Sequence, residues 1–218
     1  MKKSIFILAV LLFSGKAFCQ RTNVDLQGML VAKNLLVSQI TMIEPIQAEN
    51  KKGINCNGNI WLRSIDFSYG TIELDIRGRN EFLNSFPGIA FHATDTSRNY
   101  DVVYFRPFNF WHSDPVRRTW SVQYMSLPEY PYDRLRKENT GQFENEILPD
   151  PKPEDWIHAR IVIQKDSIKV YVNGMTAPSL SVRNLCKRNT GMLGLWTDAT
   201  IADFANLTIT KDNWTIKT

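Results

Sequence analysis

The chain has 218 residues, of which 43% are hydrophobic and 22% are charged, and its formal net charge is +4. Three of its lysines lie in the first 19 residues, which contain no acid, so the net charge of the remainder is +1. No basic stripe runs through that remainder, which argues against nucleic acid as a partner. The length is sufficient for one sizeable all-β domain.

The first residues, MKKSIFILAVLLFSGKAFCQ, have the pattern of a secretory signal peptide. Two lysines precede the apolar run Ile5–Phe13, which is too short to span a bilayer, and Cys19 ends a cleavage signature. We predict a signal peptide over 1–19, a single domain over 20–218, and a secreted or periplasmic location. A lipoprotein signal fits less well, because the bulky Phe18 stands directly before Cys19. No later segment is apolar enough to predict a transmembrane helix.

Two cysteines, Cys56 and Cys186, remain beyond the predicted leader. Export permits a disulfide between them, and their even number is compatible with one. Two buried free thiols are the alternative, since a core of this size does not need a covalent link. The sequence leaves both alternatives open.

Beyond the leader, apolar and polar residues alternate in short runs, which is the pattern of half-buried strands. One such run, TIELDIRG, places Ile72, Leu74 and Ile76 on one face and Glu73, Asp75 and Arg77 on the other. The later runs are GIAFHA (88–93), YDVVYFRPF (100–108), TWSVQYMS (119–126), WIHARIVIQ (156–164), DSIKVYVNG (166–174), GMLGLWTD (191–198) and DFANLTIT (203–210).

Strong helix patterns are nearly absent, so the runs predict an all-β sandwich or barrel. Two long irregular segments, 107–119 and 126–154, interrupt the strands. Connections of this length are usually functional or disordered, and the aromatic residues of the second segment favour an ordered loop.

The order of these runs resembles the concanavalin A-like lectin/glucanase superfamily, in the style of laminin-G-like jelly rolls and of the 3-keto-disaccharide-hydrolase-like domains of exported bacterial proteins. The resemblance covers roughly residues 27–212 and rests mainly on W…ARIVI…I.VYVNG and on G.LGLW…ADFANLTI. It implies a two-sheet antiparallel jelly-roll sandwich with long loops over a concave face that holds a sugar. These segments report the fold and are only weakly specific for chemistry.

Glu73 and Asp75 resemble part of a glycosidase strand. Two residues along a strand advance about 6.7 Å, and inclined side chains could approach the ~5–5.5 Å separation of a retaining pair. Laminarinase-like members carry a third acid, where this chain has Arg77 or Gly78. We therefore do not expect the retaining laminarinase mechanism; a charged face paired with Arg77, or a ligand-binding wall, are the alternatives. Glu144 is a further candidate, either as a catalytic acid or as a solvated loop carboxylate.

A second set of side chains offers the guanidinium, amide and aromatic groups that sugar sites use. It comprises His92, Tyr104, Arg106, Trp111, Gln123 and Arg77. If their strands are neighbours on the concave sheet, these residues converge with Glu73 and Asp75. Gln123 and Tyr124 alternate, so only one of them can face the site. A structural clamp is the alternative for Arg106, and packing over the sandwich edge is the alternative for Trp111.

The sequence predicts no cofactor and no metal site, because the three histidines have no tight ligand spacing and no HExxH motif occurs. A structural calcium ion held by TDTSRNYD or TDATIAD is a weaker prediction. We predict an exported carbohydrate-binding jelly-roll protein. The alternative is a secreted glycoside hydrolase or lyase that uses Glu73 and Asp75 or a loop carboxylate.

Overall fold

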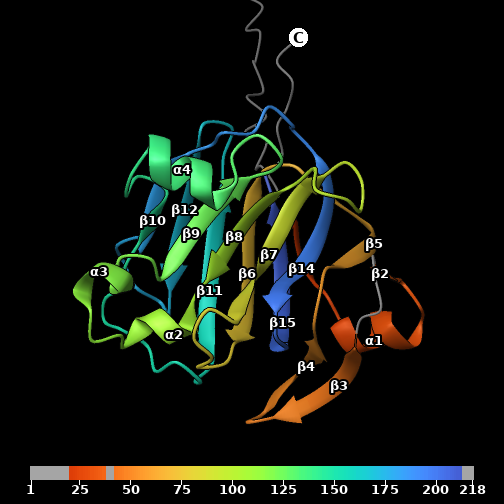
Figure 1. Ribbon diagram of the computed structural model, residues 1–218. Helices are drawn as coiled ribbons and strands as arrows, with labels where there is room; N and C mark the ends of the chain where they lie inside the picture. Colours follow the sequence, from red (N-terminus) through yellow and green to blue (C-terminus); the bar gives the residue numbers. More distant parts are fainter. Residues whose placement is uncertain (1–19, 38–41, 213–218) are drawn as a thin grey trace, which may run out of the picture.

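The computed structural model describes residues 20–37 and 42–212, so the predicted signal peptide lies outside the described residues. Within these ranges two antiparallel sheets pack face to face (Figure 1), which confirms the predicted all-β jelly-roll sandwich. No helix in the described part of the chain is long and apolar enough to cross a membrane.

We call the 8-stranded sheet the back sheet and the 7-stranded sheet the front sheet. The back sheet follows the order β13 (Leu180–Arg183), β12 (Ser167–Val172), β11 (Ile157–Ile163), β6 (Gly70–Arg77), β15 (Ala202–Lys211), β4 (Lys51–Cys56) and β3 (Ile43–Ala48), with β1 (Gln20–Asn23) paired to β15. The front sheet follows the order β10 (Glu144–Asn145), β9 (Val122–Ser126), β8 (Asp101–Phe105), β7 (Ser85–Ala93), β14 (Gly191–Ala199), β5 (Ile60–Phe67) and β2 (Leu35–Val37).

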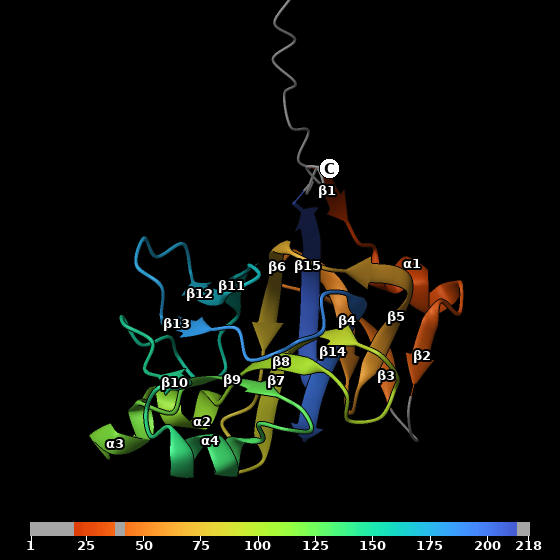
Figure 2. The same ribbon diagram turned by 90° about the horizontal axis from the view of Figure 1, so that it is seen from above.

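Short helices accompany the sheets. Helix α1 (Leu26–Val31) lies beside β4, and Asp25 caps it by accepting a hydrogen bond from the Gly28 backbone N–H at 3.1 Å. The first long connection forms α2 (Pro107–Phe110) and α3 (Pro115–Arg118), and the second forms α4 (Tyr132–Glu138) and β10. Seen from above, α2, α3 and α4 lie on the side of the front sheet that faces away from the back sheet (Figure 2).

The core lies between the sheets and follows the strand alternation. Ile72, Leu74 and Ile76 of β6 are fully buried, as the sequence predicts, and Val103 and Phe105 of β8 are fully buried in the front sheet. Burying each such side chain stabilises the fold by roughly 1.5–3 kcal/mol. The two cysteines of the described residues are free thiols, so the disulfide alternative is wrong.

The pairing of β7 with β14 slips at one point. Met192 pairs with Ala93 and Gly194 pairs with Ala90, so two residues of β7 oppose one residue of β14. The result is a β-bulge, which interrupts the alternation of side chains. His92 lies in this bulge with a left-handed φ of +53°, an uncommon value for a residue other than glycine.

Candidate functional site

A cavity of about 620 Å³ lies over the outer face of the front sheet. Strands β7, β8 and β14 form its floor, and residues of the two long connections, including α2 and α4, form its walls. Its volume falls in the range of small-ligand sites, which is roughly 300–1,000 Å³. We call this the front cavity.

Aromatic rings form the floor of the front cavity. Gly88 of β7 pairs with Tyr104 on one side and with Trp196 on the other. Because Gly88 has no side chain, the two rings lean together above it, with centroids 5.2 Å apart. A Cβ at Gly88 would lie 2.3 Å from the Val103 carbonyl oxygen, so the floor requires glycine there. Phe86 extends the floor, 6.2 Å from the Tyr104 ring.

Polar side chains on three adjacent strands form a buried network beside this floor. Gln123 of β9 pairs with Tyr104 on one side and with Glu144 of β10 on the other, so the three lie in one row. Arg106 donates to the Tyr104 hydroxyl at 2.5 Å, to Oε1 of Gln123, and to the Trp120 carbonyl at 2.7 Å. The structure therefore brings Tyr104, Arg106, Gln123 and Glu144 together, and Gln123, rather than Tyr124, faces this side.

Helix α4 completes the network through Arg136. Its Nε and Nη2 atoms donate to the two carboxylate oxygens of Glu144 at 2.9 and 2.6 Å, and Nη1 of Arg106 lies 3.7 Å from the same carboxylate. Nη1 of Arg136 has no hydrogen-bond partner among the described residues, and Arg136 lines the front cavity. This arrangement leaves a donor for a ligand while Glu144 is fully engaged.

The buried network has shifted proton affinities. Burial raises the pKa of Tyr104 to about 12, so the phenol stays protonated at neutral pH, and its hydroxyl donates to Oε1 of Gln123 at 2.5 Å. Burial also lowers the pKa of Arg106. For Arg136, burial acts in the same direction, but the paired Glu144 carboxylate outweighs it and the pKa is raised. Arg136 therefore stays charged at neutral pH and is a fixed donor in the wall of the cavity.

The walls supply further groups. Arg136 lies 4.1 Å from the centroid of the Trp120 ring and 5.9 Å from that of Tyr132. Asn109 of α2 is 1% exposed, and its amide oxygen has no partner in the described part of the chain. An unpaired buried acceptor is costly, and Asn109 lines the front cavity. Two carboxylates, Asp133 and Asp198, also line the cavity.

Trp111 lies outside the front cavity. Its side chain is 58% exposed, and it lines a second cavity of about 660 Å³ with His112, Lys152 and Glu154. Phe108 lines both cavities and separates them. Packing over the sandwich edge and a ring for a sugar both stay predictions for Trp111.

Glu73, Asp75 and Arg77 do not converge with this set, so the expectation of one shared cleft is wrong. They lie on β6 of the back sheet, and their side chains face away from the front sheet because the core residues alternate with them. The alternation identifies the outer face of a strand, but it does not say to which sheet the strand belongs. The expected pairing with Arg77 is also wrong, since Arg77 binds Asp203 at 2.8 Å and Glu49 at 3.0 Å.

Asp75 is the centre of an ion-pair network on the back sheet. It accepts hydrogen bonds from Lys51 at 2.8 Å, from His158 at 2.8 Å and from Asn206 at 2.6 Å. Burial alone would raise its pKa, but these hydrogen bonds outweigh burial and lower the pKa to about 2. Glu73 is less constrained, with His158 at 3.8 Å and Arg21 at 3.7 Å.

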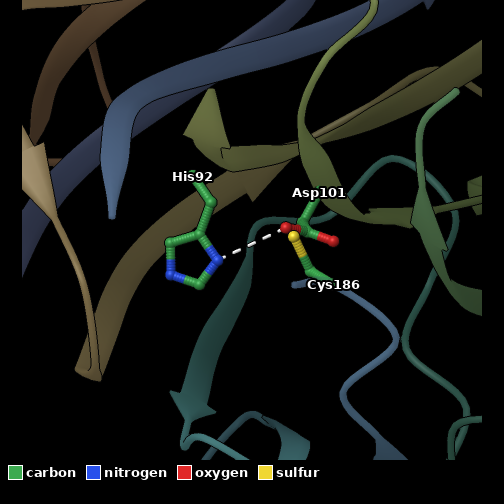
Figure 3. A group of neighbouring side chains, drawn as sticks. All are labelled: His92, Asp101 and Cys186. Atoms are coloured by element: carbon green, nitrogen blue, oxygen red, sulfur yellow. Dashed lines mark hydrogen bonds and ion pairs between the residues drawn. The ribbon is translucent and has the colours of Figure 1, made fainter. Parts of the chain in front are cut away.

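His92 does not face the front cavity either. Its side chain is fully buried on the inner side of the front sheet, where its ring nitrogens contact the Asp101 carboxylate at 3.3 Å and the Ser68 carbonyl at 2.5 Å. Figure 3 shows His92, Asp101 and Cys186 directed toward one another. The expectation of a sugar contact is wrong here, because the β-bulge reverses the direction that simple alternation assigns to His92.

Within the two segments expected to supply calcium ligands, Asp95 and Asp203 have hydrogen-bond partners in the protein. Asp95 accepts from the Ser97 backbone N–H at 2.8 Å and from Asn99 at 2.6 Å. Asp203 accepts hydrogen bonds from Arg77, Arg79 and Asn55. The calcium site stays a prediction.

Comparison with known families decides the classification. The family model of the 3-keto-alpha-glucoside-1,2-lyase-like domain matches residues 12–210. The chain belongs to this family. The resemblance inferred from the sequence, to domains of this kind within the concanavalin A-like fold, is thereby confirmed. No curated protein matches the chain in sequence.

Solved structures agree on the fold of this family member. A protein of unknown function with a galectin-like fold from Bacillus subtilis has a TM-score of 0.54 at 12% identity, with 90% of this chain and 97% of that chain covered. The carbohydrate binding module CBM66 from Bacillus subtilis has a TM-score of 0.52 at 14% identity, covering 79% and 95%. The Crh5 transglycosylase in complex with NAG has a TM-score of 0.53 at 10% identity, covering 91% and 86%. These likenesses show a fold shared with carbohydrate-binding and carbohydrate-active proteins.

Proposed function

We propose that this protein is exported and binds a glycoside or short glycan in the front cavity. The observation that carries the proposal is one cavity that joins an aromatic floor to fixed polar groups. Sugar rings present C–H faces to aromatic side chains and hydroxyls to planar polar groups. Tyr104 and Trp196 supply the first kind of contact, and Arg136 and Asn109 supply the second.

Titration calorimetry with a panel of glycans and glycosides tests the binding proposal. Arg136→Ala removes the guanidinium that lines the front cavity, so we expect at least a tenfold loss of affinity. Arg134→Ala is the matched control, because Arg134 lies on the same helix, pairs with the exposed Glu138 at 2.9 Å and does not line the cavity. Equal affinities for the two variants would refute the location of the site.

A second candidate function, a lyase acting on a 3-keto-α-glucoside, is favoured by the family match. A ketone at C3 acidifies the hydrogen on C2. A base removes that proton, the C1–O bond breaks as a C1=C2 double bond forms, and the departing oxygen takes a proton. The products are an unsaturated keto sugar and an alcohol. Asp133 and Asp198 are the candidate bases, and the guanidinium of Arg136 is placed to polarise the ketone.

Ultraviolet absorbance distinguishes the two functions, because the lyase product is a conjugated enone and a bound glycoside is not. If the protein is a lyase, we expect the absorbance to rise when a 3-keto-α-glucoside is added. The absorbance should not rise with the variant that lacks the base, which is either Asp133→Asn or Asp198→Asn. Saturable binding of glycosides without enone formation would show that the protein binds glycosides and does not cleave them. Neither outcome requires Glu73 or Asp75, which lie on the other sheet.

Export has its own support. The support is the sequence of residues 1–19, in which two lysines precede a short apolar run and a cleavage signature. Amino-terminal sequencing of the protein from the periplasm or culture medium tests this, and we expect Gln20 as the first residue. A lipid-modified Cys19 at the amino terminus would instead support the lipoprotein alternative.

A further inference from the structure

A group of metal-binding side chains lies on the inner side of the front sheet, away from the front cavity. It consists of His92 from β7, Asp101 at the start of β8, and Cys186 from the connection between β13 and β14. Their ligand atoms all lie within 4.8 Å of one another, and the nearest nitrogen and oxygen are 3.3 Å apart. Bonds of about 2.0–2.3 Å in a tetrahedral zinc site place neighbouring ligand atoms roughly 3.3–3.8 Å apart. Small side-chain movements therefore suffice to surround one ion (Figure 3).

Each of the three side chains is oriented by a partner outside the group. Nε2 of His92 lies 2.5 Å from the Ser68 carbonyl oxygen, which only accepts hydrogen bonds. Nε2 therefore carries the ring hydrogen, and Nδ1 faces Asp101. The Tyr124 hydroxyl donates to the other oxygen of Asp101 at 2.8 Å, and the Arg188 backbone N–H donates to the Cys186 sulfur at 3.1 Å. Supporting hydrogen bonds of this kind are typical of metal sites, where they fix the ligand atoms in place.

The backbone supports the same conclusion. His92 reaches the group only because the β-bulge holds it at a φ of +53°. Bulges and left-handed residues other than glycine occur preferentially next to functional sites, where they redirect a side chain. Here the redirected side chain is one of the three possible ligands.

We propose that His92, Asp101 and Cys186 hold a zinc ion. Imidazole and thiolate disfavour calcium and magnesium, and the mixed nitrogen, oxygen and sulfur set suits zinc. Of the three ligands, Cys186 also lines a cavity of about 300 Å³ together with Arg188, and this is the side from which the ion and a water molecule as fourth ligand would enter. Arg188 lies 3.5 Å from Asp101 and is the positive charge that competes with the ion.

Cobalt spectroscopy tests the site on the untagged mature protein after treatment with a chelator. We expect one equivalent of Co²⁺ to produce a thiolate-to-cobalt charge-transfer band, and Zn²⁺ to remove it. Cys186→Ser should abolish the band. Cys56→Ser is the matched control, since Cys56 is a free buried thiol on β4 of the back sheet, and it should retain the band. Absence of the band in the folded protein, or its survival in Cys186→Ser, would overturn the proposal.

Two further variants keep the test decisive if Cys186→Ser does not fold. Tyr124→Phe removes only the hydroxyl that orients Asp101, so zinc affinity should fall about tenfold, as is usual for supporting residues. Arg188→Gln removes the competing cation, so zinc affinity should rise. Affinity would be measured by competition with a chromophoric chelator, with circular dichroism to confirm folding. Unchanged zinc affinity in both variants would contradict the assignment.

Discussion

The outer faces of the two sheets contain similar residue types but use them differently. On the back sheet, Asp75 is surrounded by Lys51, His158 and Asn206, so its hydrogen-bonding capacity is spent within the protein. On the front sheet, Arg136 keeps one nitrogen without a partner among the described residues and lines a cavity of about 620 Å³. Charged side chains mark a binding site where covering elements leave space and where donors remain unused.

The front sheet gains its cavity from the two long connections. Helices α2 and α4 stand over the strands and carry Asn109 and Arg136 into the walls (Figure 2). On the back sheet, Trp156 instead lies against Arg77, whose guanidinium is 4.8 Å from the ring centroid. Trp156 lines neither the front cavity nor the second cavity. The two faces therefore separate stability from binding, and substitutions can test that separation.

The largest expected effect is on the stability of the back sheet. Asp75→Ala leaves Lys51, His158 and Asn206 without their common acceptor, and Asp75 is 4% exposed. We expect the free energy of unfolding to fall by about 3 kcal/mol, because buried groups lose their partner. Urea denaturation measures this loss. Asp75→Asn, which keeps the shape and one acceptor oxygen, should lose less, and glycan affinity should not change in the folded fraction.

The pH dependence of stability should reveal the same network. The pKa of Asp75 is about 2 in the folded protein against 3.8 as its ordinary value, so its contribution is present above about pH 4 and is lost as the pH falls through 2. This contribution is about 2 kcal/mol. His158 has the opposite sign: Asp75 raises its pKa above 6.5, so its contribution is full below that value and is lost as the pH rises through the raised pKa.

Urea denaturation of the wild type and of Asp75→Asn across this pH range isolates the two residues. The stability difference between the proteins should be greatest between about pH 4 and pH 6.5 and should shrink on both sides. A difference that stays constant down to pH 2 would show that Asp75 is not held ionised by its neighbours.

The sequence predicts the sandwich well because burial follows alternation. Ile72, Leu74 and Ile76 are spaced by two, and the structure buries all three. Alternation cannot assign a strand to a sheet, however. Strand β6 joins the back sheet by pairing with β11 and β15. The residues of β11 and β15 that pair with β6 lie more than eighty positions after it in the chain. The position of Glu73 therefore depends on contacts that no local pattern reports.

The candidate site was only partly predictable for a similar reason. Tyr104 and Gln123 occupy regular strands, Arg106 directly follows β8, and their common face follows from alternation. Asn109 and Tyr132 come from the long connections, where no periodicity indicates direction. Alternation assigns His92 to the wrong face of β7, because a bulge inserts one residue and reverses the pattern. Asn109 had one usable signal, its place among the aromatic residues of FRPFNFWHSDP.

A smaller effect on glycan affinity should distinguish an aromatic residue of the front cavity from one on the back sheet. Tyr132 lines the front cavity and its side chain is exposed, so Tyr132→Ala should fold normally. We expect about tenfold weaker glycan binding, close to 1.4 kcal/mol, through loss of a ring contact. Tyr171→Ala is the control, because Tyr171 lies on β12 of the back sheet under the guanidinium of Arg160, 3.8 Å from the ring centroid. Titration calorimetry should find the affinity of this control unchanged.

The smallest expected effect concerns Glu73, the residue that most resembles a glucanase acid. Its nearest partners are Arg21 at 3.7 Å and His158 at 3.8 Å, and exposed pairs at such distances contribute little. Glu73→Gln should change the free energy of unfolding by no more than about 0.5 kcal/mol, and glycan binding and enone formation should be unaffected. If a folded Glu73→Gln variant lost activity, the catalytic residues would have to lie on the back sheet, because Glu73 is on a different sheet from the front cavity.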